Sequence, residues 1–273
     1  MTVPDEAAAT VDDVTDDVLN ELFSIRGKTA VITGGTRGIG LMIAEAYVRA
    51  GVKVYVSSRK ADVCAQTAET LSQFGECLAI PADLSTEAEC RRLADEIAER
   101  EDRLHILINN AGATWGAPMA EHDDAAWDRV LNINVKGVFH LTRFLRPLLD
   151  AAATDGDPSR VINIGSIDGI QVPAMETYSY STAKAGVHHL TQHLARQLAP
   201  NITVNAIAPG PFESKMMAAT LDAFGDAIAA SAPMKRIGKP ADMAGIAVYL
   251  AGPASTYLTG AVIPVDGGIS TCK

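Results

Sequence analysis

The stretch TGGTRGIG, residues 33–40, follows the apolar run KTAVIT (28–33) and leads into the apolar-periodic stretch 39–50. Glycines at such a turn let the backbone approach a pyrophosphate, which binds against the unpaired N–H groups of the following helix. Because the turn stands between a predicted strand and a predicted helix, it indicates a dinucleotide-binding site rather than only a tight turn. Its spacing differs from the general G-x-G-x-x-G pattern, the glycines being Gly34, Gly38 and Gly40.

On either side of this turn, short β-branched runs alternate with helix-length segments. Buried strands are expected at 28–33, 52–57, 76–81, 104–109, 160–165, 202–207 and 261–266. Helices are expected at 39–50, 61–74, 86–101, 124–149, 176–198 and 240–251. Strands that are apolar throughout and separated by helices indicate a parallel sheet with helices on both faces. We therefore predict one α/β domain over residues 23–273, a doubly wound sheet of Rossmann type with seven parallel strands.

The composition excludes several classes of protein. The 273 residues carry 23 basic and 33 acidic side chains, a formal net charge of −10, which argues against binding of a nucleic-acid backbone through a basic face. Seven of the acids precede Arg26, with no Lys or Arg among them. This pattern predicts an acidic flexible tail over residues 1–22, with a docking arm to a partner subunit as the alternative.

We expect a cytoplasmic protein without a bound metal. No run of about 18 apolar residues and no secretory leader occurs. The cysteines form no C-x-x-C pair and no His/Cys cluster, which favours a reducing compartment; they are Cys64, Cys77, Cys90 and Cys272. His189 and His193 stand four residues apart, but no third ligand accompanies them.

The end of the second predicted strand bears on the choice of cofactor. An NAD site needs Asp or Glu there to bond the ribose 2′-hydroxyl, whereas this sequence has Ser58 and Arg59 and no carboxylate. Arg37 of the glycine turn and Arg59 can together bind a 2′-phosphate, with Ser58 hydrogen-bonding it. We predict NADP(H) as the cofactor, with two solvated arginines on an NAD enzyme as the alternative.

Eight motifs stand in order along the chain: TGGTRGIG (33–40), ADLS (82–85), NNAG (109–112), NINV (132–135), INIGS (162–166), YSTAK (180–184), NAIAPG (205–210) and VDGG (265–268). With them the chain resembles the short-chain dehydrogenase/reductase family from about Leu22 to Ile269. IPADLS (80–85), GATWGAP (112–118) and INIGS most resemble 3-oxoacyl-[acyl-carrier-protein] reductases of the rhamnolipid-biosynthesis type. The resemblance implies a homotetramer or homodimer.

Tyr180, Lys184 and Ser166 make chemical sense as a reduction site. Hydride transfer to a carbonyl carbon creates an alkoxide, which needs a proton at the same moment. Tyr180 can supply that proton, and Lys184, one helical turn further on, is expected to lower the tyrosine pKa from its usual value of about 10. Ser166 would donate a hydrogen bond to the substrate oxygen. Tyr178 has no lysine four positions on, so Tyr180 is the expected acid.

The resemblance adds further roles. It implies that Lys184 also holds the nicotinamide ribose hydroxyls and that Asn134 anchors a water in the proton relay. It also implies that Asp83 approaches the adenine and that Ser214 bonds the carboxamide. The cofactor-binding residues expected in total are Gly34, Thr36, Arg37, Gly38, Ile39, Gly40, Ser58, Arg59, Asp83, Leu84, Asn110, Ala111, Gly112, Tyr180, Lys184, Pro209, Gly210 and Ser214.

The substrate site is expected at two places besides Ser166. Residues 216–234 resemble a mobile lid in which Met216 and Met217 contact the substrate, with plain core as the alternative. Trp115 is expected either to touch the substrate or to pack internally. An acyl substrate predicts an apolar cleft around these residues and Pro173, whereas a sugar predicts polar side chains there.

The resemblance favours NADPH-dependent reduction of a 3-oxoacyl thioester to the 3-hydroxyacyl thioester. Residues 148–158 lack the basic side chains usual in reductases that use an acyl carrier protein, so acyl-CoA or a free ketone stays open. An NADP-linked alcohol or sugar dehydrogenase is one alternative. A non-catalytic NADP-sensing protein on the same fold is the other.

Overall fold

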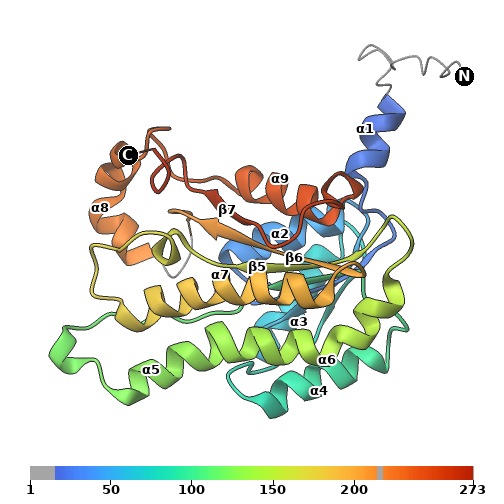
Figure 1. The fold of residues 1–273 in the computed structure, drawn as a ribbon, viewed down its shortest axis with the longest axis horizontal. Helices are drawn as coiled ribbons and strands as arrows, with labels where there is room; N and C mark the ends of the chain where they lie inside the picture. The colour runs from blue at the N-terminus through green and yellow to red at the C-terminus, as the bar shows by residue number, and fades with distance from the viewer. Residues whose placement is uncertain (1–15, 214–217, 273) are drawn as a thin grey trace, which may run out of the picture.

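A computed structural model describes residues 16–213 and 218–272. Its centre is a sheet of seven parallel strands in the order β3-β2-β1-β4-β5-β6-β7 (Figure 1). The strands are β1 (Thr29–Thr33), β2 (Lys53–Ser57), β3 (Cys77–Ala79), β4 (Ile106–Asn109), β5 (Ser159–Ile164), β6 (Ile202–Pro209) and β7 (Val262–Val265). All seven lie where the apolar runs predict them, so the predicted fold is confirmed.

Helices cover both faces of the sheet (Figure 1). The described helices are α1 (Asp16–Phe23), α2 (Gly38–Arg49), α3 (Ala61–Leu71), α4 (Glu87–Ala98), α5 (Asp124–Leu131), α6 (Gly137–Ala152), α7 (Tyr178–Leu198), α8 (Ala218–Ser231) and α9 (Pro240–Ala251). Buried side chains of α2, α3 and α9 form one apolar core with the sheet, and those of α4, α6 and α7 form the other. No helix within the two described ranges is long and apolar enough to span a membrane.

Two elements differ from the sequence-based expectation. The single helix expected over 124–149 is interrupted by a π-helical turn, Asn132–Lys136, between α5 and α6. Such turns insert one residue and reorient side chains, which hydrophobic periodicity does not reveal. Within the range expected as a tail, residues 16–22 are helical, and α1 ends with the Phe23 ring 6.5 Å from the ring of Tyr249.

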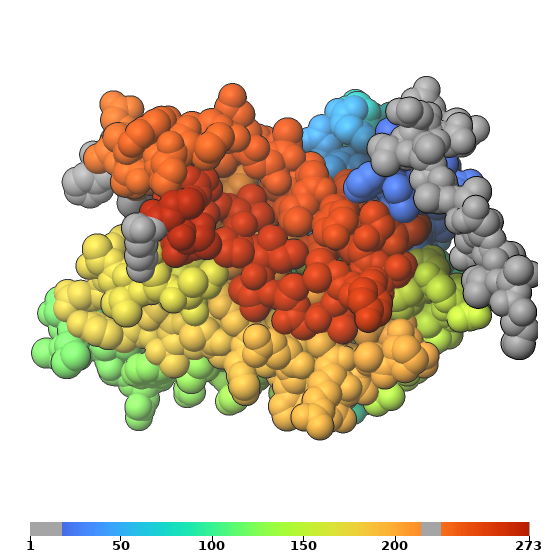
Figure 2. Space-filling model, turned by 45° about the horizontal axis from the view of Figure 1, so that its top comes forward, coloured from blue at the N-terminus to red at the C-terminus, as the bar shows by residue number. Residues whose placement is uncertain are grey.

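The C-terminal part of the chain forms much of the face seen in Figure 2. Figure 2 shows the orange surface of α8 next to the red surface of the C-terminal residues on one face of the molecule. Phe212, shortly after β6, and Gly238, shortly before α9, form an isolated parallel bridge. The two ends of the segment that contains α8 are therefore held together.

A chain of buried polar groups ties the middle of the sheet to the helices beneath it. Asn109 on β4 donates from Nδ2 to Oδ1 of Asn163 (2.9 Å) and to Oγ1 of Thr142 (3.1 Å). Asn163 on β5 donates in turn to Oγ1 of Thr191 on α7 (2.9 Å). Since buried amides are stable only when paired, this network fixes α6 and α7 relative to the strand ends that carry the site.

Thr191→Val tests this network. The change keeps the side-chain volume but leaves Nδ2 of Asn163 without its acceptor, so we expect a loss of about 1–3 kcal/mol in the free energy of unfolding. Urea denaturation measures it. Thr70→Val is the control, because Thr70 also donates to the carbonyl four residues back but is exposed. Equal losses in the two variants would contradict the role of the network.

Candidate active site

The predicted site residues that the structure describes gather at the edge of the sheet where the carboxyl ends of the strands meet. Gly38, Ile39 and Gly40 form the first turn of α2, and Pro209 and Gly210 lie at the end of β6. The loops there carry Gly34, Thr36 and Arg37 after β1, Ser58 and Arg59 after β2, Asp83 and Leu84 after β3, Asn110, Ala111 and Gly112 after β4, and Ser166 after β5. Tyr180 and Lys184 lie on the first turns of α7. Ser214, Met216 and Met217 lie outside the described residues.

The glycine turn after β1 forms a cradle that side chains would fill. Gly34 has a positive φ of 64°, and a Cβ on Gly40 would overlap the carbonyl oxygen of Gly34 and Nδ2 of Asn110. Asn110 holds the turn in place by donating to the carbonyls of Thr33 (2.8 Å) and Gly34 (3.1 Å). The open backbone and the first N–H groups of α2 fit a pyrophosphate, which is the group that the sequence predicts here.

The loops that carry the two predicted phosphate ligands start side by side. Thr33 at the end of β1 is in register with Ser57 at the end of β2, and the N–H of Gly34 donates to the carbonyl of Ser57 (2.7 Å). Arg37 and Arg59, on the loops that follow, are both exposed. Two guanidinium groups and no carboxylate at this position fit a 2′-phosphate on the adenosine ribose.

The phenol of Tyr180 is shielded from water within this cluster. Burial raises the pKa of its phenol to about 12, the negative charge of Asp168 adds to the rise, and a hydrogen bond with Ser166 opposes it. The net shift is thus upward, opposite to the lowering expected from the spacing of Tyr180 and Lys184. The ammonium Nζ lies 5.6 Å from the centre of the Tyr180 ring and donates elsewhere, so burial decides the direction.

Lys184 brings a positive charge into the protein interior. Its side chain is 5% exposed, and Nζ donates to the carbonyl of Ile164 at the end of β5 (2.7 Å). Burial lowers the pKa of the ammonium to about 8, while the nearby carboxylate of Asp168 opposes the shift. Lys184 is therefore charged at neutral pH, directly behind the loop that carries Ser166.

Asn134 lies in the π-helical turn between α5 and α6. Its Nδ2 donates to the carbonyls of Ala113 (2.7 Å) and Val130 (2.9 Å), which fixes the side chain between this turn and the loop after β4. Its Oδ1 is buried without a hydrogen-bond partner among the described residues. A Cβ on Gly112 would lie 2.6 Å from that oxygen. The free acceptor fits the water that the family resemblance assigns to this position.

Two residues near the site were not anticipated from the sequence, Asp168 and His188. Asp168 is two residues after Ser166, and its N–H donates to Oγ of that serine (3.1 Å). The imidazole of His188 is 8% exposed and fills the space in which side chains on Gly165 and Gly169 would lie. His188 follows Lys184 by one helical turn, so helical spacing was the available signal for it.

The loops after β4 and β5 form the mouth of the site. The N–H of Ala117 donates to the carbonyl of Glu176 (3.2 Å), which brings the two loops together. Large apolar side chains are exposed on both loops: Trp115 and Met119 on the first, and Ile170, Val172 and Met175 on the second. The hydroxyl of Tyr178 hydrogen-bonds to Oε1 of Glu176 (3.0 Å).

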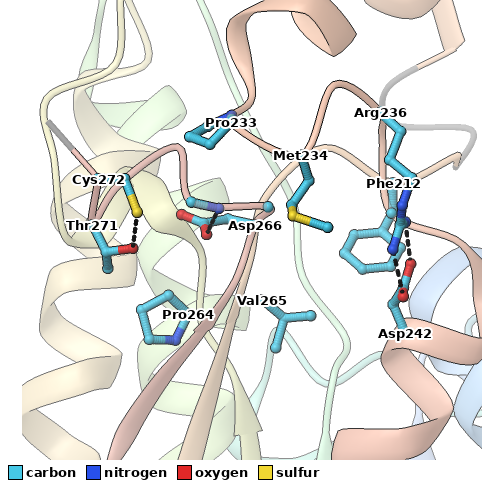
Figure 3. Close-up of a pocket in the computed structure, with 13 residues that line it drawn as sticks. Phe212, Pro233, Met234, Arg236, Asp242, Pro264, Val265, Asp266, Thr271 and Cys272 are labelled. Atoms are coloured by element: carbon cyan, nitrogen blue, oxygen red, sulfur yellow. Dashed lines mark hydrogen bonds and ion pairs between the residues drawn. The ribbon is translucent and has the colours of Figure 1, made fainter.

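A cavity of about 400 Å³ lies beside this site, against β7 (Figure 3). Phe212, Met234 and Asp266 contribute to its wall, and a two-fold ion pair between Arg236 and Asp242 flanks it. Its lining includes none of the predicted catalytic residues. Within residues 16–213 and 218–272, no group of three His, Cys, Asp or Glu side chains is placed to hold a metal ion.

A pyrophosphate cradle on a parallel sheet, together with a serine, a half-buried tyrosine and a buried lysine, defines a dinucleotide-dependent oxidoreductase. A family model described as enoyl-(acyl carrier protein) reductase matches residues 34–270. The chain belongs to the short-chain dehydrogenase/reductase family. The family and the oxidoreductase class predicted from the sequence are thereby confirmed.

The chain is also similar to individual members of this family. The chain is 46% identical over 254 residues to the rhamnolipids biosynthesis 3-oxoacyl-[acyl-carrier-protein] reductase of Pseudomonas aeruginosa, covering 92% of this chain and 99% of the relative. It is 34% identical over 246 residues to an acetoacetyl-CoA reductase of Allochromatium vinosum, covering 89% and 98%. A solved active-site complex of Pseudomonas aeruginosa RhlG with NADP superposes with a TM-score of 0.89 at 46% identity, covering 92% and 99%.

The neutral state of His188 can be tested through stability. Burial and the Lys184 charge lower the pKa of His188 from 6.5 to about 4, opposed by a hydrogen bond with the backbone of Gly169. Between pH 6.5 and 4 the unfolded chain binds a proton that the folded protein does not, so stability falls as the pH falls through this window. We expect wild type to lose about 3 kcal/mol more than His188→Leu over this range.

Urea denaturation at a series of pH values measures this difference. His189→Leu is the matched control, because His189 is the adjacent exposed histidine on α7. If wild type and His188→Leu lose stability in parallel as the pH falls, His188 is not held neutral.

Proposed function

We propose that this protein reduces 3-oxoacyl thioesters to 3-hydroxyacyl thioesters with NADPH. The observation that carries the proposal is the cluster of Tyr180, Ser166 and Lys184 at the carboxyl edge of the sheet, beside the glycine cradle. A proton donor in this position serves a reaction in which a carbonyl oxygen gains negative charge. A protein that only senses the dinucleotide has no use for such a donor.

The chain supplies the proton and the electrostatic support, and bound NADPH supplies the hydride. With a pKa of about 12, the Tyr180 phenol is protonated at neutral pH and is ready to donate to the substrate oxygen. Ser166 donates a second hydrogen bond to that oxygen as its charge develops. The Lys184 ammonium stabilises the phenolate that remains, and the free Oδ1 of Asn134 holds a water through which the proton is replaced.

The mouth of the site supports an acyl substrate. Trp115, Met119, Ile170, Val172 and Met175 present apolar surface on both loops that lead to Tyr180. An alkyl chain gains free energy by covering such surface, whereas a sugar would need polar partners in the same place. The similarity to a 3-oxoacyl-[acyl-carrier-protein] reductase and an acetoacetyl-CoA reductase supports the same substrate class, with the acyl group carried on either thiol.

The proposed cofactor specificity rests on Ser58 and the two arginines. Arg37 and Arg59 would bind the 2′-phosphate from both sides, and Ser58 would donate a hydrogen bond to it.

We also propose a cytoplasmic homotetramer, as the family resemblance implies. Mass photometry of the purified protein tests the assembly.

Turnover of acetoacetyl-CoA, followed as NADPH oxidation at 340 nm, tests the reaction. We expect Tyr180→Phe to lower kcat by a factor on the order of 10²–10⁴, because it removes the general acid while keeping the ring. Tyr178→Phe is the matched control and should retain activity, since its hydroxyl bonds only to Glu176 among the described residues. Retained activity in Tyr180→Phe would contradict the assignment of the acid.

Arg59→Glu tests the choice of cofactor. A carboxylate at this place repels the 2′-phosphate and removes one charge-assisted hydrogen bond, so we expect kcat/KM for NADPH to fall by roughly 10- to 100-fold while kcat/KM for NADH is retained or rises. Arg103→Glu is the control for the charge change, because Arg103 is exposed before β4, at the opposite edge of the sheet. Equal losses of kcat/KM with NADPH and NADH would contradict the proposed binding of the 2′-phosphate by Arg37 and Arg59.

A further inference from the structure

The thiol of Cys64 contacts the backbone and the side chain of one residue, Ser58. Its Sγ accepts from the N–H of Ser58 (3.1 Å) and lies 3.0 Å from the Ser58 Oγ and 3.4 Å from the Ser58 carbonyl oxygen. Cys64 lies in the first turns of α3 and is fully buried, so it cannot itself touch a bound dinucleotide. All three contacts are made to a residue of the proposed 2′-phosphate site.

Ser58 is also joined to the other cofactor loops through the backbone. Its carbonyl accepts from the N–H of Ala82 (3.1 Å), next to the predicted adenine neighbour Asp83. The carbonyl of Ser57 accepts from the N–H groups of Gly34 (2.7 Å) and Gly35 (3.3 Å). The Oγ of Ser57 is buried without a hydrogen-bond partner among the described residues. A polar group left unpaired at this point marks the strand end as a place for a polar ligand.

The protons available at the cluster decide what the Ser58 hydroxyl can do. The Cys64 thiol has one proton, which it can donate to the carbonyl or to the Oγ of Ser58. With the thiol as donor, the Ser58 O–H has no acceptor among the residues that the structure describes and can turn outward to an anion. The N–H of Ser58, bonded to Sγ, fixes the backbone from which the hydroxyl extends.

We propose that Cys64 is a positioning residue for NADP selection, holding Ser58 so that its hydroxyl donates to the 2′-phosphate of the dinucleotide. The inference rests on the proposed function, because it presumes the 2′-phosphate site at Ser58, Arg37 and Arg59. It adds a buried residue that acts only through Ser58. A thiol suits this place because a sulfur atom accepts and donates at longer distances than a hydroxyl and fills an apolar space.

The direct test is binding of two adenosine ligands by isothermal titration calorimetry, without any reaction. Adenosine 2′,5′-bisphosphate carries the group in question, and 5′-AMP lacks it. We expect Cys64→Ala to weaken binding of the bisphosphate about 3- to 10-fold, because one hydrogen bond to an anion is weakened but not removed, and to leave binding of 5′-AMP unchanged within about two-fold. Cys64→Ser, whose hydroxyl also donates and accepts but at shorter distances, should restore part of the difference.

Cys77→Ala is the matched control for removing a buried thiol. Cys77 starts β3, is also buried, and is not in contact with the proposed phosphate ligands. The Cys77→Ala protein should bind both adenosine ligands as wild type does. The ratio of kcat/KM for NADPH to that for NADH, measured with acetoacetyl-CoA, should fall in Cys64→Ala by the same factor as the ratio of binding constants.

A double-variant cycle with Ser58→Ala separates the inference from the function on which it rests. We expect Ser58→Ala to weaken the bisphosphate selectively and Cys64→Ala to have no further effect in that background. Suppose that Ser58→Ala weakens only the bisphosphate, while Cys64→Ala weakens both ligands equally or adds to the effect of Ser58→Ala. The role of Cys64 is then refuted, and the proposed 2′-phosphate site stands. If Ser58→Ala changes neither ligand, Ser58 does not bind the 2′-phosphate, and the role of Cys64 is refuted with it.

Discussion

The buried ammonium group of Lys184 is the feature on which the rest of the site depends. Taking a charge out of water is costly unless it is paired. Among the described residues, this ammonium has one hydrogen bond, to the carbonyl of Ile164, and the carboxylate of Asp168 lies nearby. That carbonyl ends β5, and the next two residues are Gly165 and Ser166. Holding the charge therefore also fixes the strand end from which the serine extends toward Tyr180.

The parallel sheet supplies the constraint at the next level. Because all strands run in one direction, residues far apart in sequence come together at their carboxyl ends without any special pairing. The packing there leaves little room: side chains on Gly40, Gly165 or Gly169 would overlap Asn110, His188 or the helix that carries Lys184. The glycines of the motifs are required as much by contacts between the loops as by a ligand.

The sequence predicts the fold well because apolar runs and turn residues are local signals. The positions of all seven strands, the glycine turn and the grouping of Ser166, Tyr180 and Lys184 follow from period, spacing and family resemblance. Local signals do not reveal burial by distant segments. The raised pKa of Tyr180 and the packing of His188 under the Ser166 loop depend on how deeply α7 lies against the sheet.

Other features are missed for related reasons. The π-helical turn that presents Asn134 interrupts the segment expected as one helix, and apolar periodicity does not mark such a turn. The bond between Cys64 and Ser58 joins two residues six apart in sequence across the start of a helix, where no periodicity applies. In both cases the decisive contact is made by a polar atom, whereas sequence patterns report mainly on apolar faces.

A buried charge at the site should lower the stability of the folded protein and at the same time be required for activity. The most direct measurement is the free energy of unfolding of wild type and Lys184→Met as a function of pH, together with kcat for acetoacetyl-CoA. Between the folded pKa of about 8 and the ordinary value of 10.5, the unfolded chain keeps a proton that the folded protein has lost. As the pH rises through this window, the free energy of unfolding of wild type should therefore increase relative to that of the variant by on the order of 3 kcal/mol. The variant should be inactive throughout. Parallel stability curves, or an active Lys184→Met, would contradict the account.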